Sequence, residues 1–394
     1  MEGKMMNTIQ KGSITLIKSA ITGEKLPLPE GFHIDEAKAW IGKHSLQAIC
    51  YQGAYLCGIP SDEPGMKDLF QAYYKSLIFS ERQMAEVNRV LSEFAENGID
   101  HMPLKGVNMK PLYPKPELRS MGDADILIRV KQYDLIVPIM EKLGFVDTEE
   151  TDHELVWKSS ALYLELHKRI IPSYNWDFYE YYGDGWDLAT VQEGTRYRMS
   201  PEDEWIFLFT HFAKHYRDGG IGCRHVTDLW VWLRTHPDMD TAYIERALIK
   251  LRLAEFYENM MHLIRMWFSD GPSDEKSEVI TDFVFSSGNW GAMESRAISQ
   301  GLRNVKITRG VWTAKVKYVL NILFPGVEML RHKYKILQKM PWMLPAVWIV
   351  RPFYKLIAEK KSVIQHQQNI KTMSSGNIES RKEALLYVGL DYHF

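Results

Sequence analysis

The segment from Asp123 to Val130 constrains the fold more than any other part of the chain. It reads Asp-Ala-Asp-Ile-Leu-Ile-Arg-Val, so two carboxylates two residues apart lead directly into an apolar run. Such a run predicts a buried β-strand, in which alternate side chains point to the same face. Asp123 and Asp125 would then lie side by side and repel each other unless a cation lies between them, and hard oxygen ligands suit Mg²⁺. The alternative is a solvated strand end.

A Lys-Gly turn precedes this strand. His101 to Leu104 reads as a short strand and is followed by Lys105 and Gly106. Lys105 would supply a cation, and Gly106 marks a position where the backbone can approach a phosphate closely. An ordinary turn has the same two residues. Beside a metal-binding strand, however, the turn suggests chemistry on the phosphates of a nucleotide.

A third carboxylate is expected from a neighbouring strand. Glu165 alternates with leucines in the segment Leu162–His167, on the same face as Tyr163 and His167. An unpaired buried glutamate is costly, so a metal partner would explain it. The alternative is a solvent-facing glutamate on an edge strand.

Arg119 lies four residues before Asp123. It could neutralise a phosphate or hold the carboxylates in place. The alternative is a surface arginine in a loop.

A helix is predicted from Ser200 to about Asp218. Ser200 is a good N-cap, Pro201 suits the first turn, and acids follow at the positive end of the helix dipole. His211 and His215 have the spacing of a metal-binding pair, but the glutamate of a zinc protease is missing. We favour histidines at the edge of the core, with substrate contact as the alternative.

Past the Gly-rich turn, Arg224, His225 and Asp228 would face the same cleft as this helix. The alternative for Arg224 and Asp228 is a plain i,i+4 salt bridge.

Composition excludes several classes of protein. With 394 residues the chain has room for two or three domains, and its formal net charge of −2 argues against a generally basic surface that coats nucleic acid. The three cysteines form no CxxC pair, so we expect neither disulfides nor a zinc site. We therefore expect the protein in a reducing compartment. We find no signal peptide or membrane-spanning run and expect a soluble, cytoplasmic protein.

The pattern of apolar and polar residues divides the chain into four regions. Residues 1–98 read as helical, with helices over 9–20, 35–47 and 65–96, whereas residues 99–171 read as a small α+β unit of alternating short strands and helices. Residues 172–300 are expected to be a helical domain that closes the cleft. Residues 301–394 are expected to be a helical extension with a polar, mobile stretch at 364–375.

Taken in order, the motifs resemble those of the polymerase-β-like nucleotidyltransferase superfamily and, more narrowly, of a bacterial family of uncharacterised nucleotidyltransferases. The likeness covers roughly residues 10–270. The matching pattern is Leu104-Lys105-Gly106, Tyr113, Arg119-x-x-x-Asp123-x-Asp125-Ile126-Leu127-Ile128, Leu164-Glu165-Leu166-His167, Asp203-x-Trp205, His211-x-x-x-His215 and Arg224-x-x-x-Asp228-Leu229. Many members of the superfamily carry Gly-Ser or Gly-Gly shortly before the acidic pair, where this chain has Lys105-Gly106-Val107.

The resemblance implies an α+β fold with a small mixed sheet embedded between helical regions. It implies a Mg²⁺-dependent enzyme that moves a nucleoside monophosphate from a nucleoside triphosphate to the hydroxyl of a small molecule, a protein or an RNA. Asp123, Asp125 and Glu165 would be catalytic and would hold one or two Mg²⁺ ions. The expected nucleotide contacts are Lys105, Gly106, Arg119, His167, His215 and Arg224.

The rival hypothesis is a non-catalytic binding or scaffold protein that keeps the fold. Its helical carboxy-terminal region contains two basic-aromatic stretches, residues 331–335 and 351–355. These stretches would contact a membrane surface or a partner, and the alternative is a pair of solvated helix faces.

Overall fold

The computed structural model describes residues 6–288, 293–308, 311–327, 330, 334, 336–358 and 360–393. The chain opens with four helices, α1 (Thr8–Thr22), α2 (Ile34–Lys43), α3 (Gln47–Cys57) and α4 (Met66–Glu96). Asn7 starts α1 with a capping box, in which its side chain accepts from the Gln10 amide and the Gln10 side chain accepts from the Asn7 amide. The helices expected over 9–20 and 65–96 are therefore confirmed.

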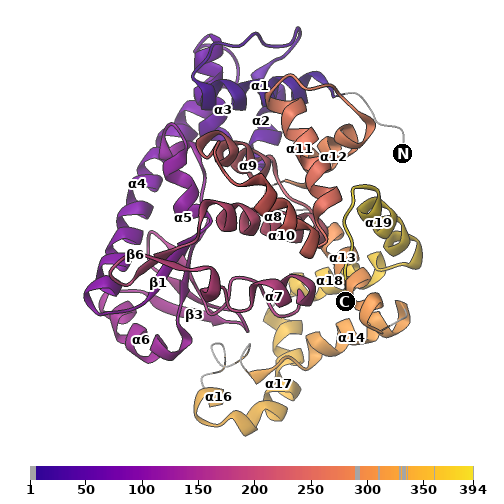
Figure 1. The fold of residues 1–394 in the computed structure, drawn as a ribbon. Helices are drawn as coiled ribbons and strands as arrows, with labels where there is room; N and C mark the ends of the chain where they lie inside the picture. The colour runs from indigo at the N-terminus through magenta and orange to yellow at the C-terminus, as the bar shows by residue number, and fades with distance from the viewer. Residues whose placement is uncertain are drawn as a thin grey trace.

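The expected helix over 35–47 is wrong at its end. The helix stops at Lys43, and a separate helix, α3, starts at Gln47. Ser45 between them has φ +56°, a left-handed conformation that a continuous helix does not accommodate. Helices α1 and α3 pack against each other at the top of the molecule in Figure 1.

A mixed seven-stranded sheet forms the centre of the fold, in the order β3-β4-β5-β2-β1-β7-β6. The strands are β1 (His101–Leu104), β2 (Ala124–Ile128), β3 (Val146–Glu150), β4 (Glu154–Lys158), β5 (Tyr163–His167), β6 (Thr190–Glu193) and β7 (Arg196–Arg198). The β2–β5 and β1–β7 pairs are parallel and the others antiparallel. The predicted α+β class with a mixed sheet is confirmed.

The expectation that the chain stays helical after residue 172 is wrong for one segment. Strands β6 and β7 form a hairpin that joins the free edge of β1, where the His101 amide donates to the Thr195 carbonyl over 3.0 Å. Both strands are short and mostly exposed, so the hydrophobic pattern that marks the inner strands is missing. The neighbouring strand supplies the pairing that stabilises them.

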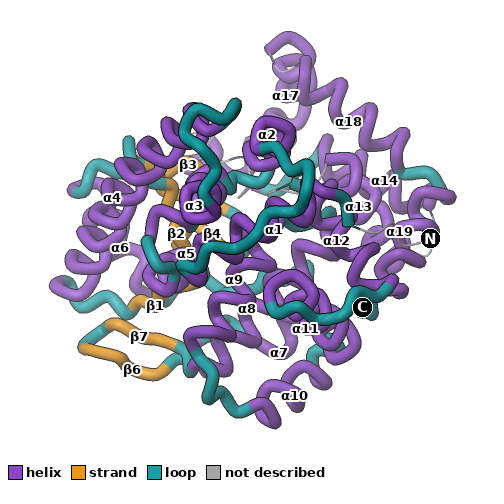
Figure 2. Tube along the Cα trace, turned by 90° about the horizontal axis from the view of Figure 1, so that it is seen from above, coloured by secondary structure: helices purple, strands orange, loops and turns teal. Residues whose placement is uncertain are grey.

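The two faces of the sheet meet different layers. Ile126 and Ile128 of β2 pack in one apolar core with α4 and α6 (Tyr133–Lys142). Leu127 points to the opposite face, into the core that contains α8 (Pro201–Asp218) and α9 (Cys223–Thr235). Figure 2 shows the strands between these two groups of helices. Because side chains alternate along a strand, Asp125 lies on the same face as Leu127, toward α8.

Short helical segments connect the strands. They are α5 (Gly106–Met109), η1 (Lys110–Leu112), η2 (Pro116–Leu118), η3 (Val130–Gln132), α7 (Trp176–Tyr182) and η4 (Trp186–Leu188).

The remainder of the described chain is helical. Its elements after α9 are α10 (Thr241–Lys250), α11 (Ala254–Phe268), α12 (Glu275–Ser287), α13 (Met293–Thr308), α14 (Val311–Leu323), α16 (Ile336–Lys339), η5 (Pro341–Met343), α17 (Leu344–Ala358), α18 (Lys360–Thr372) and α19 (Ser375–Tyr387). Within this part of the chain, α13 packs against α8. Most of the stretch 364–375, expected as a mobile tail, belongs to α18 and leads into α19, whose Ile378 and Leu385 are buried. The basic-aromatic stretch 331–335 lies outside the described residues, apart from Tyr334.

Among the residues that the structure describes, no helix combines the length and the apolar character needed to cross a membrane.

Candidate functional site

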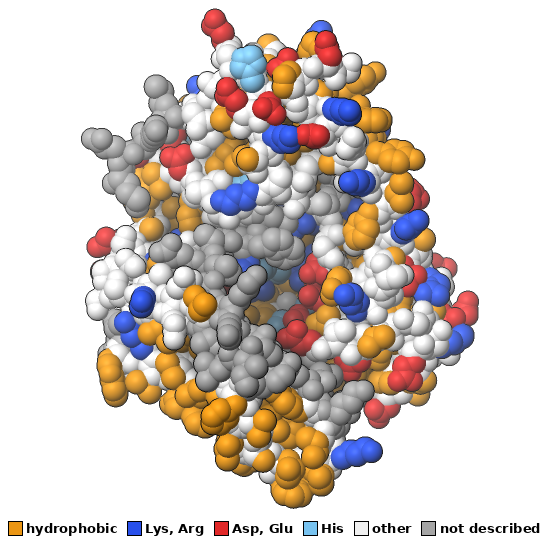
Figure 3. Space-filling model, turned by 180° about the vertical axis from the view of Figure 1, so that it is seen from behind, with side chains coloured by type: hydrophobic (Ala, Val, Ile, Leu, Met, Phe, Trp, Pro, Cys, Tyr) orange, Lys and Arg blue, Asp and Glu red, His pale blue; other side chains and the backbone are white. Residues whose placement is uncertain are grey.

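A cavity of about 550 Å³ lies between the sheet and helices α8, α9 and α13. The space-filling view in Figure 3 shows a hollow lined by acidic, basic and histidine side chains. The polar residues that line the cavity include Lys105, Arg119, Asp123, Asp125, His153, Glu154, Glu165, His167, His211, Lys214, His215, Asp218, Arg224, His225, Asp228, Arg296, Gln300 and Arg303. Every residue predicted from the sequence as part of a nucleotide site therefore faces this one cavity, Gly106 included.

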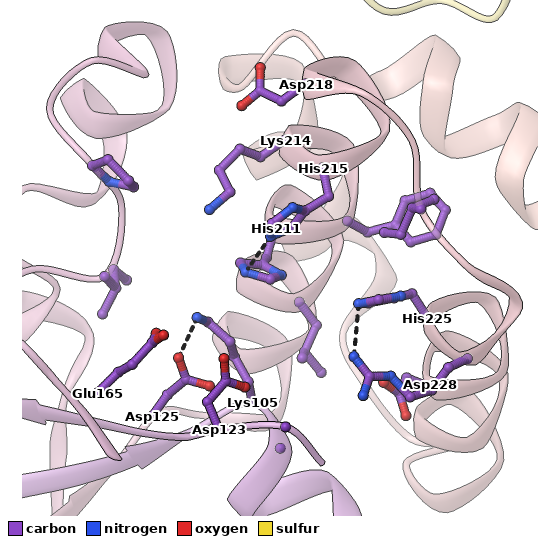
Figure 4. A pocket seen from close by; sticks show the side chains of 18 of the residues that line it. Lys105, Asp123, Asp125, Glu165, His211, Lys214, His215, Asp218, His225 and Asp228 are labelled. Carbon is purple, nitrogen blue, oxygen red and sulfur yellow. Dashed lines mark hydrogen bonds and ion pairs between the residues drawn. The ribbon is translucent and has the colours of Figure 1, made fainter. Parts of the chain in front are cut away.

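The parallel pairing of β2 and β5 brings two of the predicted carboxylates together. Asp125 and Glu165 are direct partners across the two strands, so their side chains leave the sheet on the same face. Ligand atoms of Asp125, Glu165 and His167 all lie within 4.8 Å of one another. Asp123 lies directly before β2 and faces the same cavity, beside this group (Figure 4).

Two cationic or potentially cationic groups contact Asp125. The Lys105 ammonium donates to its Oδ1 over 2.7 Å, and Nε2 of His167 lies 2.8 Å from the same oxygen. His167 Nε2 also lies 3.5 Å from an oxygen of Glu165. Lys105, expected as a phosphate contact, thus forms an ion pair with Asp125 in this structure.

The Lys-Gly turn has an unusual backbone. Lys105 has φ +42° and ψ −110°, a conformation that residues with a side chain rarely adopt. A Cβ on Gly106 would lie 2.9 Å from Sδ of Met121 and 3.1 Å from Nη1 of Arg119. A side chain at position 106 would therefore force Met121 and Arg119 to shift, so glycine suits this position. The close approach of this turn to a phosphate stays a prediction.

The crowded carboxylates have strongly perturbed proton affinities. Burial and the charges of Asp125 and Glu165 raise the pKa of Asp123 to about 7. Burial alone would raise the pKa of Asp125 as well, but Lys105 and His167 hold it well below its usual range. For His167, burial is outweighed by the hydrogen bonds to Asp125 and Glu165, which raise its pKa to about 9. Asp123 is therefore the carboxylate of the cluster that burial and acidic neighbours make hardest to ionise.

Arg119 is buried and is not the surface arginine of the alternative interpretation. Its Nε and Nη2 donate to the two carboxylate oxygens of Asp228 over 2.8 and 2.9 Å, and the hydroxyl of Tyr113 donates to the same carboxylate over 2.7 Å. Among the described residues its Nη1 has no hydrogen-bond partner. Arg119 thus holds a carboxylate, as one interpretation expected, but that carboxylate is Asp228.

The i,i+4 salt bridge considered for Arg224 and Asp228 does not form. Arg224 instead donates to the carbonyl of Ser120 over 2.8 Å, and the ion pair of Asp228 in the described chain is with Arg119. Arg224 lies against the loop before β2 and lines the cavity.

The histidines of α8 line the cavity wall. They are therefore not only residues at the edge of the core, as we favoured from the sequence, because they also face the cavity. Nε2 of His211 and Nε2 of His215 lie 3.0 Å apart, and burial together with nearby cations lowers the pKa of both well below its ordinary value. Burial and Arg224 lower the pKa of His225 to about 3. These imidazoles are neutral at pH 7 and can donate or accept hydrogen bonds at the surface of the cavity.

Lys214 and helix α13 were missed as parts of the candidate site. Burial and Lys105 lower the pKa of Lys214 to about 8, and its side chain points into the cavity (Figure 4). Arg296 and Arg303 of α13, which packs against α8, also line the cavity, and the Arg303 guanidinium lies 4.7 Å from the centre of the Tyr174 ring. Lys214 comes three residues after His211 and four before Asp218, so helical spacing places the three on one side of α8 and made Lys214 recognisable. No sequence pattern connects α13 with the acidic motifs.

With this geometry established, comparison with known proteins gives one match. Residues 30–269, more than half of the chain, match the family described as "Uncharacterised nucleotidyltransferase". The chain belongs to this nucleotidyltransferase family. The resemblance inferred from the ordered motifs is thus confirmed, and a transferase that acts on nucleotides is supported at that coarse level. No curated protein and no solved structure matches the chain.

The matched range divides the cavity of this nucleotidyltransferase family member into two parts. The acidic cluster, the Lys-Gly turn and helices α8 and α9 lie inside residues 30–269, whereas Arg296, Gln300 and Arg303 lie outside it. The wall formed by α13 therefore comes from the part of the chain beyond the family match.

Proposed function

We propose that this family member is a Mg²⁺-dependent nucleotidyltransferase that transfers a nucleoside monophosphate from a nucleoside triphosphate to a hydroxyl acceptor. The observation that carries the proposal is the convergence of Asp125 and Glu165 from two parallel strands, with Asp123 beside them, in a cavity that cations also line. A polyphosphate site needs these two kinds of group next to each other.

The residues at the cluster fit a hard divalent cation. Their donors are mainly carboxylate oxygens, which Mg²⁺ prefers. A bound cation would also offset the charges of Asp125 and Glu165, which after burial raise the pKa of Asp123. Asp123, Asp125 and Glu165 would hold the ion. Bound there, Mg²⁺ would neutralise charge on the phosphates and on the leaving pyrophosphate.

The chain's own residues would do the rest. In the transfer, the acceptor oxygen bonds to the α-phosphorus as the bond from that phosphorus to the bridging oxygen of pyrophosphate breaks. Glu165 is half-buried at the edge of the cluster and would accept the hydroxyl proton of the acceptor. Lys214 and Arg224 face the cavity from α8 and α9 and would bind the polyphosphate, and His215 would donate a hydrogen bond. Lys105 keeps Asp125 ionised.

We also propose a reducing, cytoplasmic location. The three cysteines are free thiols, and two of them, Cys50 and Cys223, are buried. Free thiols in every cysteine suit a compartment in which disulfides do not form.

Isothermal titration with Mg-ATP, Mg-GTP, Mg-CTP and Mg-UTP tests the function, with and without EDTA. We expect the wild-type protein to bind at least one of the four and to lose that binding in EDTA. Asp125→Asn and Glu165→Gln should each abolish the metal-dependent part of the binding. Asp238→Asn, which changes an exposed acid in the loop between α9 and α10 that does not line the cavity, should bind as the wild type does. Circular dichroism would establish that each variant is folded.

The acceptor is sought only after a nucleotide is found. Incubation with the preferred α-³²P-labelled nucleotide and candidate hydroxyl compounds should release pyrophosphate and leave the label on the acceptor. A wild-type protein that binds none of the four nucleotides in Mg²⁺ would contradict the proposal and favour the non-catalytic alternative.

A further inference from the structure

The solvent-facing side of α17 is apolar over the residues whose side chains the structure describes, 344–353. The exposed positions of this helix and of the preceding η5 include Trp342, Pro345, Ala346, Ile349, Val350 and Phe353. Their spacing places them on one helical face, which we call the apolar face of α17. Trp342 is 72% exposed, Ile349 68% and Phe353 65%. A helix on the surface of a globular protein ordinarily turns polar residues to solvent, so this pattern is reversed.

Contacts on the other side hold α17 in this orientation. Val347 is buried with Leu330 and Leu337 in a small core of its own. The Trp348 indole donates to the carbonyl of Pro325 over 2.9 Å, and the Arg351 guanidinium donates to the carbonyl of Ile322. The polar groups of Trp348 and Arg351 are thus used on the inner side, and the apolar face remains in water.

The patch is located at one end of the molecule. Figure 1 shows α16 and α17 at the lower end, away from the sheet, and Figure 3 shows hydrophobic side chains gathered at that end. Phe324 (49% exposed) and Leu320 of α14 add further exposed apolar surface. Contiguous exposed apolar surface of this kind marks a surface that another phase or molecule covers.

The charge of the surrounding segment differs from that of the rest of the chain. Residues 311–372 contain eleven Lys and Arg but only two Glu and no Asp. The segment therefore carries a formal charge of +9, and because the whole chain carries −2, the remainder carries −11. A basic segment with exposed tryptophan and phenylalanine has the composition of helices that lie in the interface of an anionic bilayer.

We propose that α17 and η5 bind the surface of an anionic lipid membrane, with the apolar face of α17 entering the headgroup region. The proposal is independent of the proposed nucleotide chemistry. A second copy of the chain is a poorer occupant, because two segments of charge +9 would repel each other. RNA is also a poorer occupant, since a helix face made only of apolar side chains offers nothing to phosphates.

Co-sedimentation of the full chain with vesicles tests the proposal. Vesicles of phosphatidylcholine alone are compared with vesicles of phosphatidylcholine mixed with phosphatidylglycerol, at low and high salt. We expect the wild type to pellet with the mixed vesicles at low salt and to be released at high salt. Ile349→Ser combined with Phe353→Ser should lower the partition constant at least about tenfold, because two exposed apolar side chains are removed.

A matched control uses the same residue types elsewhere. Ile249 on α10 and Phe70 on α4 are 66% and 50% exposed, so Ile249→Ser combined with Phe70→Ser should leave the partition constant unchanged. Equal loss in both double variants would contradict the proposal. So would wild-type protein that ignores the mixed vesicles or binds phosphatidylcholine alone equally well.

Two further measurements distinguish the other occupants. Analytical ultracentrifugation without lipid should give the same mass for the wild type and for Ile349→Ser/Phe353→Ser, and a dimer lost in that variant would replace the membrane by a second copy. Fluorescence anisotropy with a labelled single-stranded RNA should show no binding that depends on Ile349 and Phe353. RNA binding that the double variant abolishes would overturn the proposal in favour of nucleic acid.

Discussion

Arg119 and Asp228 form a bidentate ion pair inside the protein, with Nε–Oδ1 and Nη2–Oδ2 distances of 2.8 and 2.9 Å. The pair connects the loop before β2 to helix α9, and the hydroxyl of Tyr113 completes the shell around the carboxylate. It lies directly behind the Lys-Gly turn, since Nη1 of the arginine is one of the atoms that a Cβ on Gly106 would meet. The ion pair with Asp228 therefore holds the loop that carries Arg119 and Asp123 against helix α9.

Arg119→Ala should destabilise the protein strongly. Removing one partner of a buried ion pair leaves the other charge unpaired, which typically costs about 3–5 kcal/mol of unfolding free energy. Urea denaturation measures the loss. Lys142→Ala removes the exposed ion pair with Glu93 and should change stability by less than about 1 kcal/mol. Wild-type stability of Arg119→Ala together with lost nucleotide binding would instead make Arg119 a phosphate contact.

Gly219 should not tolerate a side chain. It has φ +144°, and a Cβ there would lie 2.8 Å from Cα and 2.9 Å from the amide nitrogen of Arg296, at the contact of α8 with α13. We expect Gly219→Ala to lower the unfolding free energy by about 2–4 kcal/mol, through backbone strain and overpacking together. Gly144→Ala is the control, because Gly144 has φ +82° but open space around it, so only the conformational part applies, about 1–2 kcal/mol. If both variants lost the same unfolding free energy in urea denaturation, α13 would shift away from the new Cβ at no energetic cost, which would contradict the overpacking part of the prediction.

Glu204 should make stability fall as pH rises through the mildly acidic range. Burial raises its pKa from an ordinary value of 4.5 to about 7, although Asn108 donates to it. The folded state therefore binds this proton more tightly than the unfolded state, and its advantage is lost progressively from pH 4.5 to about 7. Glu204→Gln should remove roughly 2–3 kcal/mol of that loss.

Urea denaturation at several pH values measures the difference between the wild type and Glu204→Gln. Glu245→Gln, an exposed substitution on α10, should follow the wild-type pH curve. If Glu204→Gln gave the same slope as the wild type, Glu204 would not be the group responsible.

Lys214→Met should weaken triphosphate binding without harming the fold. The lowered pKa of this lysine means that burial disfavours its charge, so an apolar side chain of similar length should keep or raise the unfolding free energy. Loss of a charge-assisted contact to phosphate should weaken binding of the preferred nucleoside triphosphate about tenfold to a hundredfold, with a smaller effect on the monophosphate. Lys250→Met, an exposed change on α10, serves as the control in the same titrations. Equal weakening of both nucleotides would place Lys214 at the nucleoside instead.

The order of motifs was sufficient to predict the family and the parts of the sheet that carry its acids. Strand β1 was predicted at its observed bounds. Strand β2 was predicted from the apolar run that follows the two aspartates, and β5 from the leucines that alternate with Glu165. The N-cap of α8 at Ser200 was also predicted, and it is confirmed because the Ser200 hydroxyl accepts from the Asp203 amide over 3.1 Å. These signals are local, since each depends on a few consecutive residues.

The side-chain pairings across the cavity could not be predicted from local sequence signals. Spacing suggested that Arg224 would pair with Asp228, yet the carboxylate pairs with Arg119, more than a hundred residues earlier in the chain. The β6–β7 hairpin likewise depends on the free edge of β1. Partner choice between distant segments follows from how the layers pack, and a local pattern carries no information about it.

The sequence by itself determined the family, the α+β class and the identity of the acidic residues, because periodicity and motif order are properties of neighbouring residues. Only the tertiary structure decided that Asp125 faces Glu165, that Lys105 neutralises Asp125, and that α13 closes the cavity. It also decided that the apolar face of α17 points to water, since an apolar stripe on a helix looks the same in sequence whether it is buried or exposed. Burial and long-range contacts set those outcomes, and they exist only once the chain has folded.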